Sequence, residues 1–225
     1  MKTRAPGKSP YPEVQAEILA LLHSVPDAVV LDAGCGNGHE LRGWLPFIKD
    51  GMGIDISAEN VEKGKGCNLK LIRGDARKTP FRASSFDIII ANYVVEHIGE
   101  PTEFVQEMAR ILKSKGVLAM IAPNIQSPIP LMTKVVSHKW QKRIKKKYFT
   151  REEEAYPVYY RLNTVSVLDQ TMVDQGFIKK KIKRFSSSGI FSEKPYWYFW
   201  FLGYLATKIF PQLKGVIYAE YIKAE

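Results

Sequence analysis

The sequence predicts an α/β fold built on a doubly wound, mostly parallel sheet. Short runs of β-branched and other apolar residues alternate with helix-length amphipathic segments over residues 27–123. Strands and helices that alternate in this way form parallel sheets with helices on both faces. A glycine-rich turn follows the first apolar run, which is typical of nucleotide-type sites at the ends of such strands. At 225 residues, we expect one domain with insertions.

Apolar periodicity, capping residues and breakers locate the individual elements. The expected helices begin at residue 11 and at residue 38 or 39, and then span 57–65, 101–113 and 164–176. The expected strands span 29–32, 51–56, 68–73, 86–91, 117–122, 177–185 and 215–223. The residues expected to face inward from the 164–176 helix are Val165, Leu168, Met172 and Val173.

Residues 29–38, VVLDAGCGNG, join a buried strand to a helix through the glycine-rich turn. Glycine lets the backbone turn tightly and approach a ligand without a Cβ atom in the way. A plain turn is one interpretation, and the dinucleotide fingerprint G-x-G-x-x-G is another. Here the spacing is G-x-G-x-G, and His39 stands where the third dinucleotide glycine belongs. Asp32, two residues before the first glycine, favours a cationic ligand instead.

This stretch resembles the first motif of class I S-adenosylmethionine (SAM) methyltransferases, whose fold is Rossmann-like. In that family the acid and the glycine loop hold the methionine end of the cofactor. The resemblance therefore implies cofactor contacts at Asp32, Gly34, Cys35 and Gly36.

A second acid, Asp55, ends the second strand and is followed by Ile56, and we expect both to bind the cofactor. In folds of this class a carboxylate at this position binds the ribose, because one ionised carboxylate can accept from both hydroxyls. The alternative is that Asp55 caps the next helix. Ser57 follows, however, and is the better cap.

The resemblance covers residues 27–123 motif by motif. Asp75 follows the third strand, where an aspartate of the family accepts from the adenine amino group and the next residue, here Ala76, offers its backbone N–H. The loop after the fourth strand, which in the family passes between cofactor and acceptor, opens here with Asn92 and Tyr93. The final strands resemble the family's antiparallel tail more loosely, so we expect an antiparallel last strand.

Glu96 and His97 form the most chemically loaded pair in the chain. A neutral His97 can act as general base toward an acceptor hydroxyl or thiol, and Tyr93 is the second candidate catalytic residue. A purely structural histidine is the alternative. The segment also resembles O-methyltransferases of quinone biosynthesis, in which Glu-x-x-Glu-His binds a divalent ion. Tyr93 stands at the first Glu, so no metal site is predicted.

The net charge and the cysteine content indicate which partners and which cellular compartment to expect. The chain has 33 Lys and Arg against 23 Asp and Glu, a formal net charge of +10, which favours acidic partners such as nucleic acid, anionic lipid or phosphorylated substrates. Cys35 and Cys67 make no disulfide framework, and the start of the sequence lacks the apolar stretch of a signal peptide. We therefore expect a cytoplasmic protein, with peripheral membrane contact as an addition.

Two inserts, 124–163 and 186–214, are expected to form a helical and aromatic substrate cap beside the SAM-binding core of 27–123 in a single 1–225 domain. The basic run 138–148 is either a solvated helix face or a contact for anionic lipid. The aromatic run 196–210 is either a lid over an apolar substrate or a helix in lipid headgroups. Further candidates for the substrate side are Tyr159, Tyr160 and Arg161.

These observations predict a SAM-dependent methyltransferase that releases S-adenosylhomocysteine and methylates a small or lipid-like acceptor on oxygen. The sequence lacks the Asn/Asp-Pro-Pro-aromatic tetrad used to methylate adenine or amide nitrogens, which makes a nucleic-acid partner the weaker hypothesis. Three alternatives stay open. They are an RNA or protein methyltransferase, a polyamine synthase of the same fold, and a catalytically silent adaptor at a membrane surface.

Overall fold

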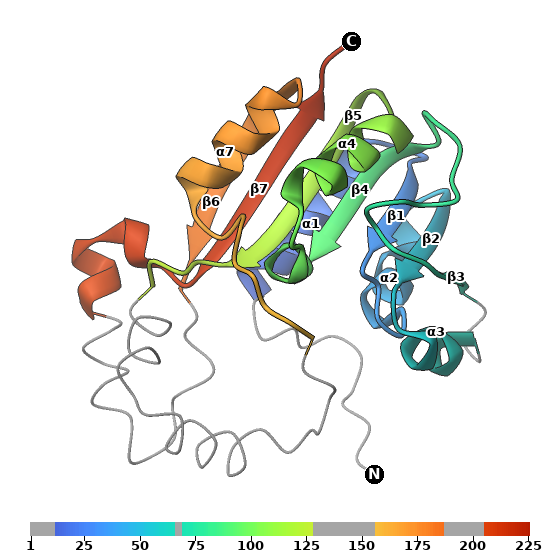
Figure 1. Cartoon of the computed structure of the whole chain (residues 1–225), viewed down its shortest axis with the longest axis horizontal. Helices are drawn as coiled ribbons and strands as arrows, with labels where there is room; N and C mark the ends of the chain where they lie inside the picture. Colours follow the sequence, from blue (N-terminus) through green and yellow to red (C-terminus); the bar gives the residue numbers. More distant parts are fainter. Residues whose placement is uncertain (1–11, 66–68, 128–155, 187–204) are drawn as a thin grey trace.

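The computed structural model describes residues 12–65, 69–127, 156–186 and 205–225, which contain a seven-stranded sheet (Figure 1). The strands are β1 (Val29–Ala33), β2 (Asp50–Asp55), β3 (Lys70–Arg73), β4 (Phe86–Asn92), β5 (Leu112–Pro123), β6 (Phe177–Phe185) and β7 (Val216–Lys223). The helices are α1 (Pro12–Ser24), α2 (His39–Trp44), α3 (Ala58–Lys65), α4 (Pro101–Ile111) and α7 (Val165–Asp174), with short 3-10 turns η1 (Leu45–Phe47), η2 (Val95–His97) and η3 (Pro211–Leu213).

The sheet has the strand order β3-β2-β1-β4-β5-β7-β6. β1 to β5 pair in parallel, whereas β7 pairs antiparallel with both β5 and β6. In Figure 1 the arrow of β7 accordingly runs opposite to those of β4, β5 and β6. The predicted doubly wound sheet with an antiparallel last strand is therefore confirmed. The strand order reverses between β1 and β4, and ligands bind beyond the carboxyl ends of the strands at such a switch point.

The strands bury apolar side chains on both faces, as expected for a sheet covered by helices on both sides. On one face, α1 and α2 pack through Ile18 and Trp44 against strand residues such as Val30. On the other face, α4 and α7 pack through Phe104 and Leu168, and Figure 1 shows these two helices over the near side of the sheet. This framework fixes the carboxyl ends of β1, β2, β3 and β4 relative to one another.

The boundary between α4 and β5 differs from the sequence prediction. The helix ends at Ile111 rather than at residue 113, and β5 begins at Leu112 rather than at residue 117. Leu112 pairs with Phe86 across an irregular register in β4, so its apolar side chain serves the sheet instead of the helix. Val173, predicted to face inward from α7, is 54 % exposed, because it lies about 100° around the helix from Met172.

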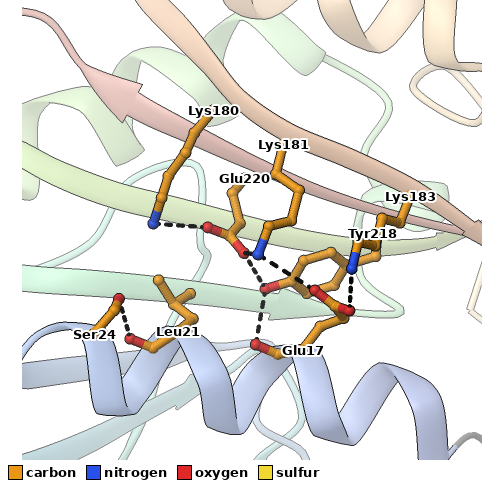
Figure 2. A network of polar contacts seen from close by, with 8 residues as sticks. All are labelled: Glu17, Leu21, Ser24, Lys180, Lys181, Lys183, Tyr218 and Glu220. Atoms are coloured by element: carbon orange, nitrogen blue, oxygen red, sulfur yellow. Dashed lines mark hydrogen bonds and ion pairs between the residues drawn. The ribbon is translucent and has the colours of Figure 1, made fainter.

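A network of ion pairs joins α1 to the tail strands (Figure 2). The register of β6 shifts between Lys179 and Lys181, and Lys180 and Lys181 both reach the fully buried Glu220, at 2.9 and 3.1 Å. A bulge of this kind places an extra residue against the partner strand. The Tyr218 hydroxyl also donates to Glu220 at 2.8 Å.

Glu17 extends the network to α1, because its carboxylate pairs with Lys181 and Lys183 at 3.3 and 2.6 Å. The helix is thereby held against the edge of the sheet that carries β6 (Figure 2). Among the helices in the described ranges, none is long and apolar enough to cross a membrane.

Candidate active site

The glycine loop is tied to the end of β2 by backbone hydrogen bonds. Gly34 and Cys35 donate their N–H groups to the Ile54 carbonyl at 2.7 and 3.0 Å. Gly36 donates to the Asp55 carboxylate at 2.7 Å. The two stretches that the sequence singled out, joined by a contact across 19 residues, therefore form one continuous structure at the carboxyl ends of the strands.

Two glycines of the loop have different reasons to be glycine. Gly34 has φ +80°, and a Cβ there would overlap the side chain of Val94 from the loop after β4. Gly36 has φ +53°, and a Cβ there would project into open space with no protein atom within 4 Å. Gly34 is thus required for the close approach of the two loops, while the open space at Gly36 leaves its backbone accessible to a ligand.

Cys35 has a packing role in this loop. Its side chain is 8 % exposed and lies against Gly53 of β2, where an added Cβ would come within 2.6 Å of the sulfur. Burial, together with the charges of Asp32 and Asp55, raises the pKa of the Cys35 thiol. A thiol in this state is a poor nucleophile, which agrees with a packing role for the Cys35 side chain.

Asp32 is an acid without a compensating cation in the part of the chain described here. Its residue is 3 % exposed, and burial followed by the charges of Glu40 and Asp55 raises its pKa to about 8. Glu40 begins the first turn of α2 and accepts a hydrogen bond of 2.6 Å from the Gln15 side chain of α1. Asp32, Glu40 and Asp55 repel one another electrostatically, which favours the uncharged form of Asp32. A cationic ligand group, such as the ammonium of a methionine moiety, would relieve this repulsion.

Asp55 keeps capacity for a ligand although its carboxylate already accepts two hydrogen bonds. One oxygen accepts from Gly36, and the other accepts from the N–H of Ser57 at 2.9 Å. A carboxylate offers about four acceptor sites, so two are left for the hydroxyls of a ribose. Ser57 is the helix cap, since its hydroxyl accepts from the Asn60 N–H at 3.2 Å.

The residue after Asp55 is unusually open for its type. Ile56 is 57 % exposed at the edge of the sheet, where an aliphatic side chain gains by covering a flat apolar group such as a purine. This position fits the predicted cofactor contact.

Asp75 lies beyond β3 and is engaged by a neighbouring cation. Arg77 donates its backbone N–H and its guanidinium to the two carboxylate oxygens, the shortest contact being 2.7 Å. The hydrogen bonds from Arg77 lower the pKa of Asp75. An adenine amino group that donates to Asp75 would therefore bind a carboxylate that Arg77 already occupies in part. Ala76 is half-buried against the core.

The loop after β4 meets the glycine loop. Asn92 ends the strand, and Tyr93 adopts φ +56° while its N–H donates to the Ile121 carbonyl of β5 at 2.9 Å. A left-handed conformation is uncommon for a tyrosine, and it turns the chain so that Val94 reaches Gly34. The predicted cofactor residues of the two loops are therefore brought together.

His97 lies in η2, at the far side of the same loop, together with Glu96. The His97 Nδ1 atom lies 2.9 Å from the Pro157 carbonyl oxygen. Glu96 is 6 % exposed, burial raises its pKa to about 7, and its Oε2 atom has no hydrogen-bond partner among the described residues. Burial, and after it the charge of Glu96, raise the pKa of Tyr160.

The structure brings some of the predicted acceptor-side residues together and leaves others apart. His97, Tyr159 and Tyr160 meet through Glu96 and Pro157, whereas Arg161 is exposed. The basic run 138–148, Cys67 and most of the run 196–210 lie outside the described residues. Leu205, Ile209 and Phe210, at the end of that run, are about half exposed or more, from 45 to 64 %, so the choice between a lid and a lipid contact stays a prediction.

Sequence reasoning missed three participants. Glu40 adjoins Asp32, Gln15 donates a hydrogen bond to Glu40, and Pro157 contacts His97 through its carbonyl group. An acid in the first turn of the helix after a glycine loop was a usable signal for Glu40. The partners of Gln15 and Pro157 depend on contacts across 25 and 60 residues, which no local pattern reveals. In the described ranges, no group of three or more His, Cys, Asp or Glu is arranged to hold a metal ion.

Comparison with known proteins agrees with this geometry. Residues 31–120 match a family model described as a methyltransferase domain. The chain is 32 % identical over 116 residues to the uncharacterized methyltransferase YcgJ of Bacillus subtilis, covering 48 % of this chain and 46 % of that protein. It is 30 % identical over 110 residues to a malonyl-[acyl-carrier protein] O-methyltransferase of Herminiimonas arsenicoxydans, covering 47 and 41 %.

The fold agrees over a longer range. The crystal structure of YcgJ superposes with a TM-score of 0.61 at 18 % identity, covering 95 % of this chain and 99 % of that one. In sequence, the chain aligns with less than half the length of these two relatives. The fold and the site define a SAM-binding methyltransferase domain. Over residues 31–120 the chain therefore carries a methyltransferase domain of the class I SAM-dependent type, and SAM is the cofactor of that class.

Proposed function

We propose that this protein transfers the methyl group of SAM to a small or lipid-like acceptor, on an oxygen atom. The observation that carries the proposal is the row of acids and open glycine backbone at the carboxyl ends of three adjacent strands. Asp32 lies one residue before the end of β1, Asp55 ends β2, and Asp75 lies two residues beyond β3. Gly36, which donates its N–H to Asp55, faces open space.

The residues present fit the cofactor. Asp32 and Glu40 would face its ammonium group, the free acceptor sites of Asp55 its ribose hydroxyls, and Ile56 its adenine ring. When bound, the cofactor supplies an activated methyl group on a sulfonium sulfur. The protein's contribution is to hold donor and acceptor close and in line, to exclude water and to remove the acceptor proton.

His97 is the candidate for proton removal. His97 follows Val94 on the loop after β4, and Val94 contacts Gly34 of the glycine loop. An acceptor bound beside His97 would therefore be near the cofactor site. Tyr93, the second candidate, precedes Val94 at the turn of the same loop. We propose that His97 accepts the proton of an acceptor hydroxyl while Tyr93 lines the passage between the two ligands.

The acceptor class is inferred from the surface beside His97 and from a relative. Tyr156, Val158, Tyr159 and Tyr160 are 39 to 50 % exposed there, and such a surface suits an apolar or aromatic molecule better than a strongly charged one. The Herminiimonas relative is named as an O-methyltransferase of malonyl-[acyl-carrier protein], which supports oxygen as the acceptor atom.

Calorimetric titration with SAM and S-adenosylhomocysteine tests the cofactor half of this proposal. We expect micromolar binding to the intact chain and a loss of about 100-fold in Asp55→Ala, since two charge-assisted hydrogen bonds disappear. Asp50→Ala is the matched control, because Asp50 is an aspartate at the opposite end of the same strand and pairs with the exposed Lys70. Absence of binding to either ligand by folded protein would favour the silent adaptor.

Acceptor screening follows, with radiolabelled methyl transfer to phenols, hydroxylated lipids and small carboxylic acids. Transfer to a hydroxyl or carboxyl oxygen supports the proposal. Transfer to RNA or protein instead, with binding that weakens as salt rises, would contradict the small-acceptor assignment. Use of a decarboxylated cofactor without methyl transfer would favour a polyamine synthase.

A further inference from the structure

Segment 156–161 is docked onto the loop that carries the candidate base. The N–H groups of Tyr159 and Tyr160 both donate to the Glu96 carbonyl oxygen, at 2.8 and 3.2 Å. The His97 Nδ1 atom lies 2.9 Å from the Pro157 carbonyl oxygen, across 60 residues of chain. Two adjacent residues of η2 thus hold the segment through three polar contacts.

Packing adds to these contacts. The Tyr156 and His97 rings lie edge to face, with centroids 6.0 Å apart and an interplanar angle of 69°. The Tyr159 ring lies beside Gly99, where an added Cβ would be 3.5 Å from its carbon atoms. Leu162, directly after the segment, is fully buried in the core. The position of the Pro157 carbonyl is therefore fixed from both sides of the segment.

The contact with Pro157 determines which nitrogen of His97 carries the proton. A backbone carbonyl oxygen can only accept a hydrogen bond, so Nδ1 must be the donor. A neutral imidazole has one N–H, and Nε2 is then left with a lone pair. A second hydrogen bond of this kind is how proteins select the reactive nitrogen of a histidine.

We propose that segment 156–161 is a positioning element of the reaction, which holds neutral His97 in the Nδ1–H form and so makes Nε2 the base. The inference rests on the proposed function of His97 and extends it. Pro157 touches His97 rather than the acceptor, so it is a positioning residue. Its action requires that the Glu96 carbonyl keep the segment in place.

Nuclear magnetic resonance of the full chain labelled with ¹⁵N-histidine tests this directly and needs no acceptor. Long-range proton–nitrogen correlations distinguish a protonated ring nitrogen from an unprotonated one. The His97 signals are assigned by their loss in His97→Gln. We expect a protonated Nδ1 and an unprotonated Nε2. His23 is an internal control, since its Nδ1 lies 2.7 Å from the Leu19 carbonyl oxygen, within α1, and should show the same form.

Tyr159→Pro removes one of the two N–H groups that bind the Glu96 carbonyl. We expect the proton of His97 to move to Nε2 in part or in full in this variant, while His23 is unchanged. Tyr159→Ala is the matched control, because it loses the same side chain but keeps the N–H that donates to the Glu96 carbonyl oxygen at 2.8 Å. It should leave His97 in the Nδ1–H form. Circular dichroism confirms that both variants fold.

Two results would overturn the proposal. One is an Nε2–H form of His97 in the unaltered protein, and the other is an unchanged Nδ1–H form in folded Tyr159→Pro. Failure of the proposed function would look different. In that case the tautomer would be as expected, but His97→Gln would retain full methyl transfer, which would contradict the role of His97 as base.

Discussion

Buried carboxylates in two regions of the sheet have opposite pKa shifts. At the tail, Glu220 is 0 % exposed, and although burial acts to raise its pKa, hydrogen bonds from Lys180, Tyr218 and Lys181 lower it. At the glycine loop, Asp32 is 3 % exposed, and burial and the neighbouring acids raise its pKa to about 8. Both side chains are almost inaccessible to solvent, but Glu220 has two lysines and a tyrosine hydroxyl as partners, whereas the charged neighbours of Asp32 are acids.

This difference separates a structural acid from a ligand-binding one. Glu220 finds its cations within the chain, on the bulged strand β6, so its charge is already compensated without a ligand (Figure 2). Asp32 lies near Glu40 and Asp55 and has no cationic partner among the described residues, so a cationic ligand group would stabilise its charged form. Stability and binding are therefore assigned to different strands of one sheet, and substitutions should separate them.

The largest expected effect is on stability, in Glu220→Gln. The variant keeps the shape of the side chain but leaves Lys180 and Lys181 facing a neutral group and weakens the bond to Tyr218. Breaking a buried ion pair destabilises by about 3 kcal/mol or more, and urea unfolding at neutral pH would measure it. SAM affinity should be unchanged. Glu59→Gln, on an exposed surface pair with Lys63, is the control, and a loss as small as in that control would contradict the comparison.

Asp32→Asn should have the reverse profile. We expect SAM binding to weaken by about 2 kcal/mol, roughly 30-fold, because a charge-assisted contact is lost. The pKa of Asp32 is raised when folded, so the unaltered protein loses stability as pH rises from about 4 toward 8.

The asparagine variant removes that loss, because it cannot ionise. Thermal unfolding should therefore show the variant more stable near pH 8 and similar near about pH 4. Equal stability at both pH values would show that Asp32 meets a cation that compensates its charge. Asp50→Asn, at the other end of the neighbouring strand, should change neither property.

Much of the fold and of the cofactor edge follows from local sequence. Runs such as 29–31 and 86–91 are strands because their β-branched and apolar side chains fit a sheet buried on both faces. Once the strands are parallel, Asp32, Asp55 and Asp75 must share one edge. The predicted positions of these acids relative to the strands are confirmed by β1, β2 and β3.

The remaining features depend on contacts between distant segments. The apolar side chain of Leu112 is compatible with the end of a helix or the start of a strand. Its pairing with Phe86 places it in β5. The register shift at Lys180 brings two lysines to one acid, which an alternating pattern over 177–185 does not indicate. The docking of Pro157 on His97 spans 60 residues. The positions of the three acids relative to the strands were therefore predictable from the sequence, whereas the contacts around His97 were not.

Glu96 is the third buried acid, and it lies between the two extremes. Like Asp32 it has no cation among the causes that set its pKa, which burial raises to about 7, but unlike Asp32 it adjoins the docked segment through its own carbonyl. An acid with a raised pKa in the folded state stabilises less as pH rises. The unaltered protein should thus lose stability between about pH 4.5 and about pH 7 through this group, and by no more than about 1.4 kcal/mol per pH unit.

Glu96→Gln should abolish that part of the pH dependence, because glutamine resembles the protonated acid and does not ionise. Unfolding in urea across this pH range would measure it, with Glu100→Gln at an exposed position of the same loop as control. The variant keeps the backbone carbonyl that binds segment 156–161, so the Nδ1–H form of His97 should persist. A steeper loss of stability with pH in the variant would mean that Glu96 is ionised and paired, as Glu220 is. The acid would then belong to the structural class rather than to the site.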